Sequence, residues 1–128
     1  MISENEALEI HSILIERFGG SNGLRDKALL KSALNRPLQT FDGQQLYPTA
    51  IDKAAAILES IVKNHPFIDG NKRTGYVLAR LILMNEHLDI KADKEQKYQF
   101  VIDISTGSLD FEQIKEWLSK NSRYYKRE

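Results

Sequence analysis

Apolar residues recur every three or four positions in six stretches of the chain, the spacing expected of helices that bury one face. Five of these stretches open on a Ser, Thr or Asp that can cap a helix, and four carry an acid or amide three residues later. The predicted caps are Ser3, Asp26, Thr49, Asp93 and Asp110, and a further helix should begin near Asn71 or Lys72. Helix ends are expected at Gly19-Gly20, Pro37, Asn64 and Gly107. The pattern therefore predicts an all-α fold of about six helices.

Two of the predicted helices should lie at the centre of the core. The helix after Thr49 is apolar around most of its circumference, with Ile51, Ala54, Ala55, Ile57, Leu58, Ile61 and Val62. The next carries Val77, Leu78, Leu81, Ile82, Met84 and Leu88, so it too is predicted to be buried. His87 should lie near the end of this helix, where an imidazole meets the helix dipole favourably. His11 is expected at the surface or half-buried, and the tail from Ser122 to Glu128 is expected to fray.

Residues 37–48 interrupt the helical pattern. Asp42-Gly43 is a hairpin-turn dipeptide, with Leu38 and Phe41 before it and Leu46 and Tyr47 after it. The segment is predicted to form a short β-hairpin or an ordered loop. A lone two-stranded ribbon is marginal unless it packs on something. It can therefore serve as a flap over a site or as a plain connection, and the sequence leaves both interpretations open.

Composition narrows the class of protein. A chain of 128 residues is expected to form one domain, residues 1–128, with a core that needs no disulfides. Its 18 basic and 18 acidic residues cancel, so we expect no direct binding to nucleic acid through overall charge. There is no cysteine, no signal-peptide pattern at the N-terminus, and no apolar run near the roughly 18 residues of a membrane span. We expect a cytoplasmic protein without a membrane partner.

The stretch His65-Pro-Phe-Ile-Asp-Gly-Asn-Lys-Arg-Thr-Gly75 places a dense set of polar side chains between the two central helices. Backbone N–H groups and the dipole at a helix N-terminus attract anions, and Gly70 lets a ligand approach the backbone. Lys72 and Arg73 are unfavourable at a helix N-terminus unless an anion binds there. Asp69 offers Mg²⁺ an oxygen ligand, and His65 can accept a proton near neutral pH. The spacing favours a phosphate site over a simple cap with an exposed ion pair.

This stretch strongly resembles the signature of the Fic/Doc family, HPFx(D/E)GN(G/K)RxxR, and its NKR ending is typical of the Doc, or death-on-curing, branch. The segments Gly23-Leu-Arg-Asp and Leu34-Asn-Arg-Pro also look like Doc-type proteins. The resemblance implies a compact helical Fic fold with a β-hairpin flap beside the active-site loop. It implies that His65 is the general base, that Asp69 holds Mg²⁺ and that Phe67 anchors the loop. Nucleotide phosphates would then be bound by Gly70, Asn71, Lys72 and Arg73, with Arg73 also catalytic.

The last arginine of the signature falls at position 76, where this chain has Tyr76. Together with Lys72 in place of glycine, this departure favours phosphoryl transfer from ATP, as in the Doc toxin, over the AMP transfer typical of Fic enzymes. The resemblance implies a protein Ser/Thr kinase that inhibits translation by modifying elongation factor Tu. Protein AMPylation is the enzymatic alternative, and a catalytically inactive domain that binds a nucleotide or a partner is the non-enzymatic one.

The family's intramolecular brake resembles (S/T)xxxE(G/N). Ser12 and Glu16 match this pattern, but Arg17 replaces its final residue. Because that brake is incomplete, we expect restraint by a separate antitoxin protein.

Overall fold

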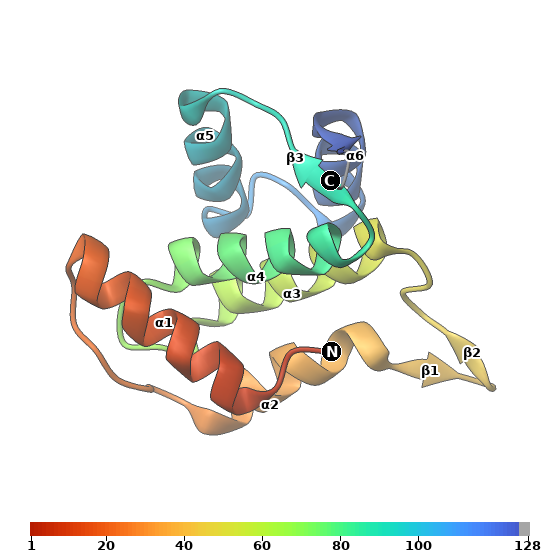
Figure 1. Ribbon diagram of the computed structural model, residues 1–128. Helices are drawn as coiled ribbons and strands as arrows, with labels where there is room; N and C mark the ends of the chain where they lie inside the picture. The colour runs from red at the N-terminus through yellow and green to blue at the C-terminus, as the bar shows by residue number, and fades with distance from the viewer. Residues whose placement is uncertain (126–128) are drawn as a thin grey trace.

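The computed structural model describes residues 1–125, which form six α-helices, one 3-10 helix and four short strands (Figure 1). In chain order the elements are α1 (Glu4–Phe18), α2 (Lys27–Asn35), η1 (Arg36–Leu38), β1 (Thr40–Phe41), β2 (Gln44–Gln45), α3 (Ala50–Asn64), α4 (Asn71–Asn85), β3 (Leu88–Ile90), α5 (Lys94–Ser105), α6 (Phe111–Asn121) and β4 (Ser122–Tyr124). The predicted all-α class with a small β-hairpin is therefore confirmed.

The helix starts follow from local capping. Ser3, Thr49, Asp93 and Asp110 each accept a hydrogen bond from the third residue of their helix, whose side chain bonds back to the cap. Asp26 caps α2 through the backbone N–H of Leu29. These bonds satisfy N–H groups that have no partner inside the helix. The predicted starts, and the predicted ends of α1 and α3, are confirmed.

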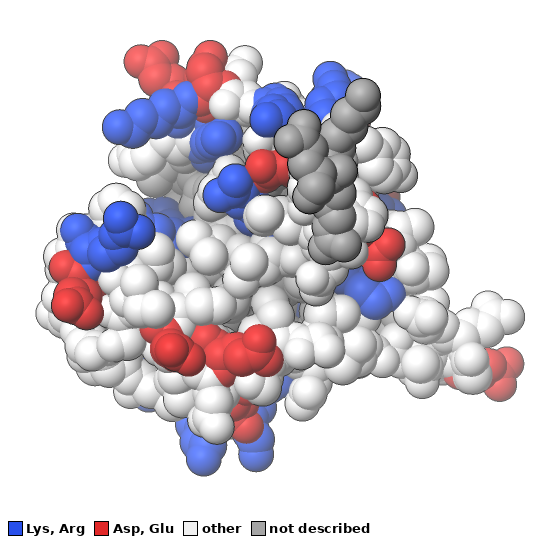
Figure 2. All heavy atoms as spheres, viewed as in Figure 1, with Lys and Arg blue, Asp and Glu red and all other residues white. Residues whose placement is uncertain are grey.

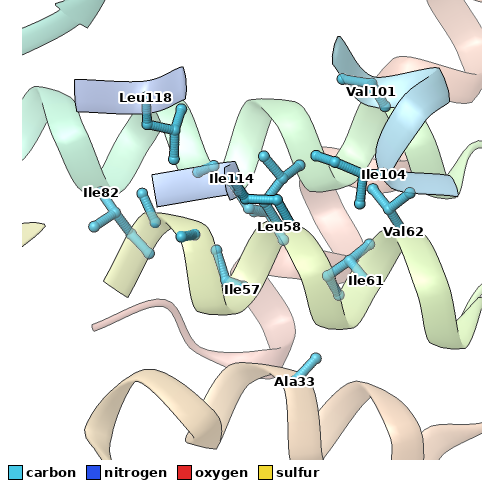
Figure 3. Close-up of a cluster of buried hydrophobic side chains, with 14 of the residues drawn as sticks. Ala33, Ile57, Leu58, Ile61, Val62, Ile82, Val101, Ile104, Ile114 and Leu118 are labelled. Atoms are coloured by element: carbon cyan, nitrogen blue, oxygen red, sulfur yellow. The ribbon is translucent and has the colours of Figure 1, made fainter. Parts of the chain in front are cut away.

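Helices α3 and α4 run antiparallel through the middle of the molecule, with α1 and α2 on one side and α5 and α6 on the other (Figure 1). The apolar side chains of α3 that were predicted to be central, from Ala54 to Val62, have no exposed surface. Figure 3 shows Ile57, Leu58 and Ile61 lying among side chains of the layers on either side. Burial of each such side chain contributes about 1.5–3 kcal/mol to the free energy of folding. The packed helices on both sides of α3 and α4 therefore support the connection between these two helices.

The predicted hairpin forms, but it does not lie beside that connection. Thr40 pairs with Gln45 across a turn in which Asp42 and Gly43 both have positive φ, as a two-residue hairpin turn requires. Lys53, in the first turn of α3, holds it by donating to Gln45 at 2.9 Å. His65 follows the other end of this 15-residue helix, about 22 Å away along its axis, and Figure 1 shows the hairpin projecting from the far end. The expected position was therefore wrong, because the sequence does not show where a connection leaves the core.

The prediction for the end of α4 also needs correction. The helix ends at Asn85, His87 adopts a left-handed φ of 62°, and Leu88 begins strand β3 instead of extending the helix. β3 pairs antiparallel with β4, so residues 122–124 of the predicted frayed tail are ordered, while residues 126–128 lie outside the described part. Leu81, predicted to be buried in α4, is 38% exposed. The pairing joins segments more than 30 residues apart, which no local pattern reveals.

Within residues 1–125, no helix is long and apolar enough to cross a bilayer.

Candidate active site at the start of helix α4

The loop from His65 to Gly70 connects the two central helices. His65 ends α3 in the left-handed conformation, with a φ of 51°, and its side chain is exposed. Within residues 1–125 the imidazole makes no hydrogen bond to the protein. The left-handed turn takes the chain sharply out of α3, and Pro66 follows it because proline disfavours a continuing helix. The exposed ring of His65 is therefore accessible to a substrate.

The segment from Gly23 to Asp26 holds the loop in place. Arg25 donates from Nε to the carbonyl of His65 and from its terminal nitrogen to that of Asn64, both at 2.6 Å. The backbone N–H of Arg25 also donates to the carbonyl of Pro66 at 2.7 Å. A guanidinium here satisfies carbonyls at the end of α3 and suits the negative end of its dipole. No local sequence pattern indicates this role of Arg25, because the contact spans 40 residues.

Phe67 anchors the loop by packing against a histidine of α1. Its ring is fully buried and stacks on His11, with centroids 3.8 Å apart and planes 6° from parallel. His11 Nε2 donates to the carbonyl of Asp69 at 2.7 Å, since a carbonyl can only accept. The prediction of a surface or half-buried His11 was wrong, as only 2% of it is exposed. Its partners lie in the loop, more than 50 residues away, so its own helix carried no signal of them.

The side chain of Asn71 braces the same loop. It is 7% exposed, its Oδ1 accepts from the N–H of Phe67 and its Nδ2 donates to the carbonyl of Phe67, both at 2.9 Å. These two bonds satisfy both backbone groups of a buried residue. The amide predicted to bind phosphate is thus occupied inside the protein. Asn71 can offer a ligand only its backbone N–H, at the start of α4.

Asp69 is exposed beside the same helix terminus and is held as a carboxylate. Hydrogen bonds from the backbone N–H groups of Ser21, at 3.1 Å, and Gly70, at 2.9 Å, lower the pKa of its side chain. Gly20, two residues beyond α1, has a φ of 115°, and a Cβ there would lie 2.7 Å from Oδ2 of this carboxylate, so glycine at this position allows the close approach. Among residues 1–125 no three His, Asp or Glu side chains come together as metal ligands. A divalent ion on Asp69 would therefore take most of its ligands from substrate and water, as Mg²⁺ commonly does.

Gly70, Lys72 and Arg73 form the cationic start of α4. Gly70 has a φ of 76°, a backbone conformation that favours glycine, and a Cβ there would lie 3.0 Å from the Ile15 side chain. Lys72 and Arg73 are exposed and form no ion pair within residues 1–125. The guanidinium of Arg73 lies 4.1 Å from the ring centroid of Phe18, a contact that orients it. Two uncompensated cations thus lie where the dipole of α4 also attracts an anion.

A pocket of about 360 Å³ opens beside these residues. One wall runs from Asp69 to Arg73 and on to Tyr76, and burial raises the pKa of the Tyr76 phenol. The other wall is α5, from which Lys97, Tyr98, Val101 and Ile102 contribute. Figure 2 shows Lys and Arg side chains over the end of α1 and over α5, with Asp and Glu side chains next to them. His65 does not line this pocket, and sequence analysis did not single out the wall on α5.

Comparison with known proteins agrees with this geometry. The Fic/DOC family model matches residues 1–83, which include the whole loop, the segment from Gly23 to Asp26 that holds it, and the start of α4. Toxin Doc of Mycolicibacterium smegmatis is 36% identical to this chain over 99 residues, 76% of each chain. Protein kinase doc of Escherichia phage P1 is 24% identical over 119 residues, 93% of each chain. The chain therefore belongs to the Fic/DOC family and to its Doc branch.

Proposed function

We propose that this protein is a Doc-type toxin that transfers the γ-phosphate of ATP to a Ser or Thr hydroxyl of a target protein. The observation that carries the proposal is the start of α4, where Lys72 and Arg73 line one pocket with the carboxylate of Asp69. Neither cation forms an ion pair within residues 1–125. The names of the two relatives, a Doc toxin and a protein kinase, support the same activity. By the family resemblance the target is elongation factor Tu, whose modification would inhibit translation in the cytoplasm.

The residues present can supply each part of this reaction. His65 takes the proton from the target hydroxyl while the hydroxyl oxygen attacks the γ-phosphorus. The bond from the γ-phosphorus to the β–γ bridging oxygen breaks, and ADP leaves. Lys72, Arg73 and the backbone N–H of Asn71 neutralise the phosphate oxygens. Asp69 fits Mg²⁺, because each of its oxygens accepts one backbone hydrogen bond and retains a lone pair for the ion. Bound Mg²⁺ would neutralise charge on the triphosphate.

The two departures from the family signature favour γ-phosphoryl transfer over AMP transfer. Lys72 places a long cationic side chain where the AMP-transferring signature has glycine, and Tyr76 removes the second arginine. The phosphate site thereby gains a cationic side chain at position 72 and lacks one at position 76. A triphosphate bound in the reverse direction, with its γ end at His65, fits this charge distribution. The two reactions differ only in which phosphorus lies in line with His65.

Isotope position in the nucleotide tests the reaction. Purified protein, Mg²⁺ and elongation factor Tu should give a labelled target from γ-labelled ATP and none from α-labelled ATP. His65→Ala should lower the rate by roughly 10²- to 10⁴-fold, because the general base is lost. His87→Ala is the matched control, since His87 is also exposed but lies beyond the opposite end of α4. A target labelled from the α position would establish AMP transfer instead.

We also propose that a separate antitoxin restrains this protein. The intramolecular brake is incomplete, and within residues 1–125 Glu16 forms no ion pair with Lys72 or Arg73. The hairpin region offers apolar surface for such a partner, with Leu38, Phe41 and Leu46 all more than half exposed. Expression alone should slow growth, and co-expression with the antitoxin should restore it. Equal growth in both cultures, with the protein present in the lysate, would contradict a toxin role.

A further inference from the structure

The wall of the pocket formed by α5 has the chemistry of a binding surface. Lys97 and Tyr98 line it in the second turn of the helix, and Val101 and Ile102 continue it one turn later. All four lie beyond residue 83, where the match to the family model ends. Neither the signature nor the family match therefore assigns them a role.

Lys97 is a half-buried cation without a counter-charge. Within residues 1–125 no carboxylate lies within ion-pair distance of its ammonium group, and the same holds for Lys72 and Arg73. By contrast Lys115, also partly buried, holds Asp52 at 3.0 Å. The pocket thus gathers three cations, and Asp69 is the one acid that lines it. Like charges in a partly enclosed site repel each other, and a polyanion would turn that repulsion into attraction.

The same wall also has an apolar part. Tyr98 is 68% exposed, although it lies beside Val101, which is buried. An exposed aromatic face next to aliphatic side chains suits stacking of a flat ring, as occurs when proteins hold a nucleobase. The pocket therefore has a cationic region at the start of α4 and an aromatic region on α5. A nucleoside triphosphate combines the two matching chemistries.

We propose that Lys97 and Tyr98 bind ATP, Lys97 through the phosphates next to the ribose and Tyr98 by stacking on the base. The proposal rests on the proposed kinase function and extends it to α5. Lys97 supplies from another helix the charge that the signature places at position 76, since Tyr76 lines the same pocket. His65 lies outside the pocket. If the adenine base is held on α5, the triphosphate extends from there along the start of α4. The γ end is then the one nearest His65.

Calorimetric titration of the full chain tests this assignment without relying on activity. The probes are the non-hydrolysable analogue adenylyl imidodiphosphate and inorganic tripolyphosphate, both with Mg²⁺. Lys97→Met should weaken binding of both probes by about tenfold or more, because a charge-assisted bond to phosphate is lost. Tyr98→Ala should weaken only the nucleotide analogue, by roughly 5- to 100-fold. Lys94→Met is the matched control, because Lys94 is on the same helix but does not line this pocket.

The outcomes separate this proposal from the one it extends. Loss of affinity in the Lys97 and Tyr98 variants, with the Lys94 variant unchanged and all melting temperatures alike, supports the assignment. If the unaltered protein binds the analogue and both variants bind it equally well, the assignment is overturned and the kinase proposal stands. If the unaltered protein binds neither probe, the ATP-dependent function fails and the assignment fails with it.

Discussion

Replacing Asn71 with alanine should destabilise the protein even when no nucleotide is present. The side chain makes two hydrogen bonds, each 2.9 Å long, to the N–H and C=O of Phe67. Both backbone groups belong to a buried residue, and within residues 1–125 Asn71 is their only hydrogen-bond partner. Their loss differs from the loss of a ligand contact, because a side chain that serves only to bind phosphate can be removed from the free protein with little effect.

The magnitude follows from these two bonds. A buried polar group left without a partner costs about 1–3 kcal/mol, so two such groups give about 2–6 kcal/mol. The exposed neighbours of the loop will admit some water, which favours the lower half of this range, about 2–4 kcal/mol. For 128 residues the unfolding entropy near 60 °C is about 270 cal/mol/K. The Asn71→Ala melting temperature should therefore fall by about 7–15 °C.

Thermal unfolding followed by circular dichroism, without nucleotide or Mg²⁺, measures this change. Asn85→Ala is the control, because Asn85 ends the same helix, is exposed and loses the same atoms. Its melting temperature should stay within about 2 °C of the unaltered protein, as for most surface substitutions. Hydrogen exchange at the Phe67 amide gives a local measure and should become faster only in the Asn71 variant. A melting temperature and an exchange rate that both remain unchanged would refute the bracing role.

Three further outcomes are expected. His11→Leu should remove a stacking contact and a hydrogen bond, lowering the free energy of unfolding by about 1–3 kcal/mol in chemical denaturation and accelerating exchange at Phe67. Gly75→Val should destabilise by about 1–3 kcal/mol, since even a Cβ would lie 3.0 Å from a side chain of α3; an unchanged midpoint in urea would contradict this close packing. Hydrogen bonds from Arg80 lower the pKa of the Asp89 carboxyl in the folded protein. The pair therefore contributes its full stability at pH values above the unfolded-state pKa of about 4, and this contribution is lost as the pH falls through the lower pKa of the folded state. Asp89→Asn should therefore reduce the loss of stability between pH 5 and about pH 2 in thermal melts, and an identical pH dependence would argue against the pair.

Most helix boundaries could be predicted from the sequence, because capping is a local interaction. Ser3 bonds with Glu6 and Asp110 with Gln113 across three residues, so the pattern that predicts each cap contains both partners. The hairpin turn at Asp42-Gly43 was predictable for the same reason. The candidate site was found because its charged residues follow one another from His65 to Arg73. A contiguous stretch with this chemistry is visible before the chain folds.

How those residues are held, and what surrounds them, depends on contacts between distant parts of the chain. His11 is buried because Phe67 and the carbonyl of Asp69 pack against it from the loop, and its helical position alone indicated a surface residue. Asn71 was expected to bind phosphate, but its side-chain amide is bonded to the backbone of Phe67 inside the loop. Lys97 joined the pocket only through the docking of α5 against α4. In each case the partner is distant in sequence. Apolar periodicity predicts that one face of a helix is buried, but it does not indicate which residues pack against that face.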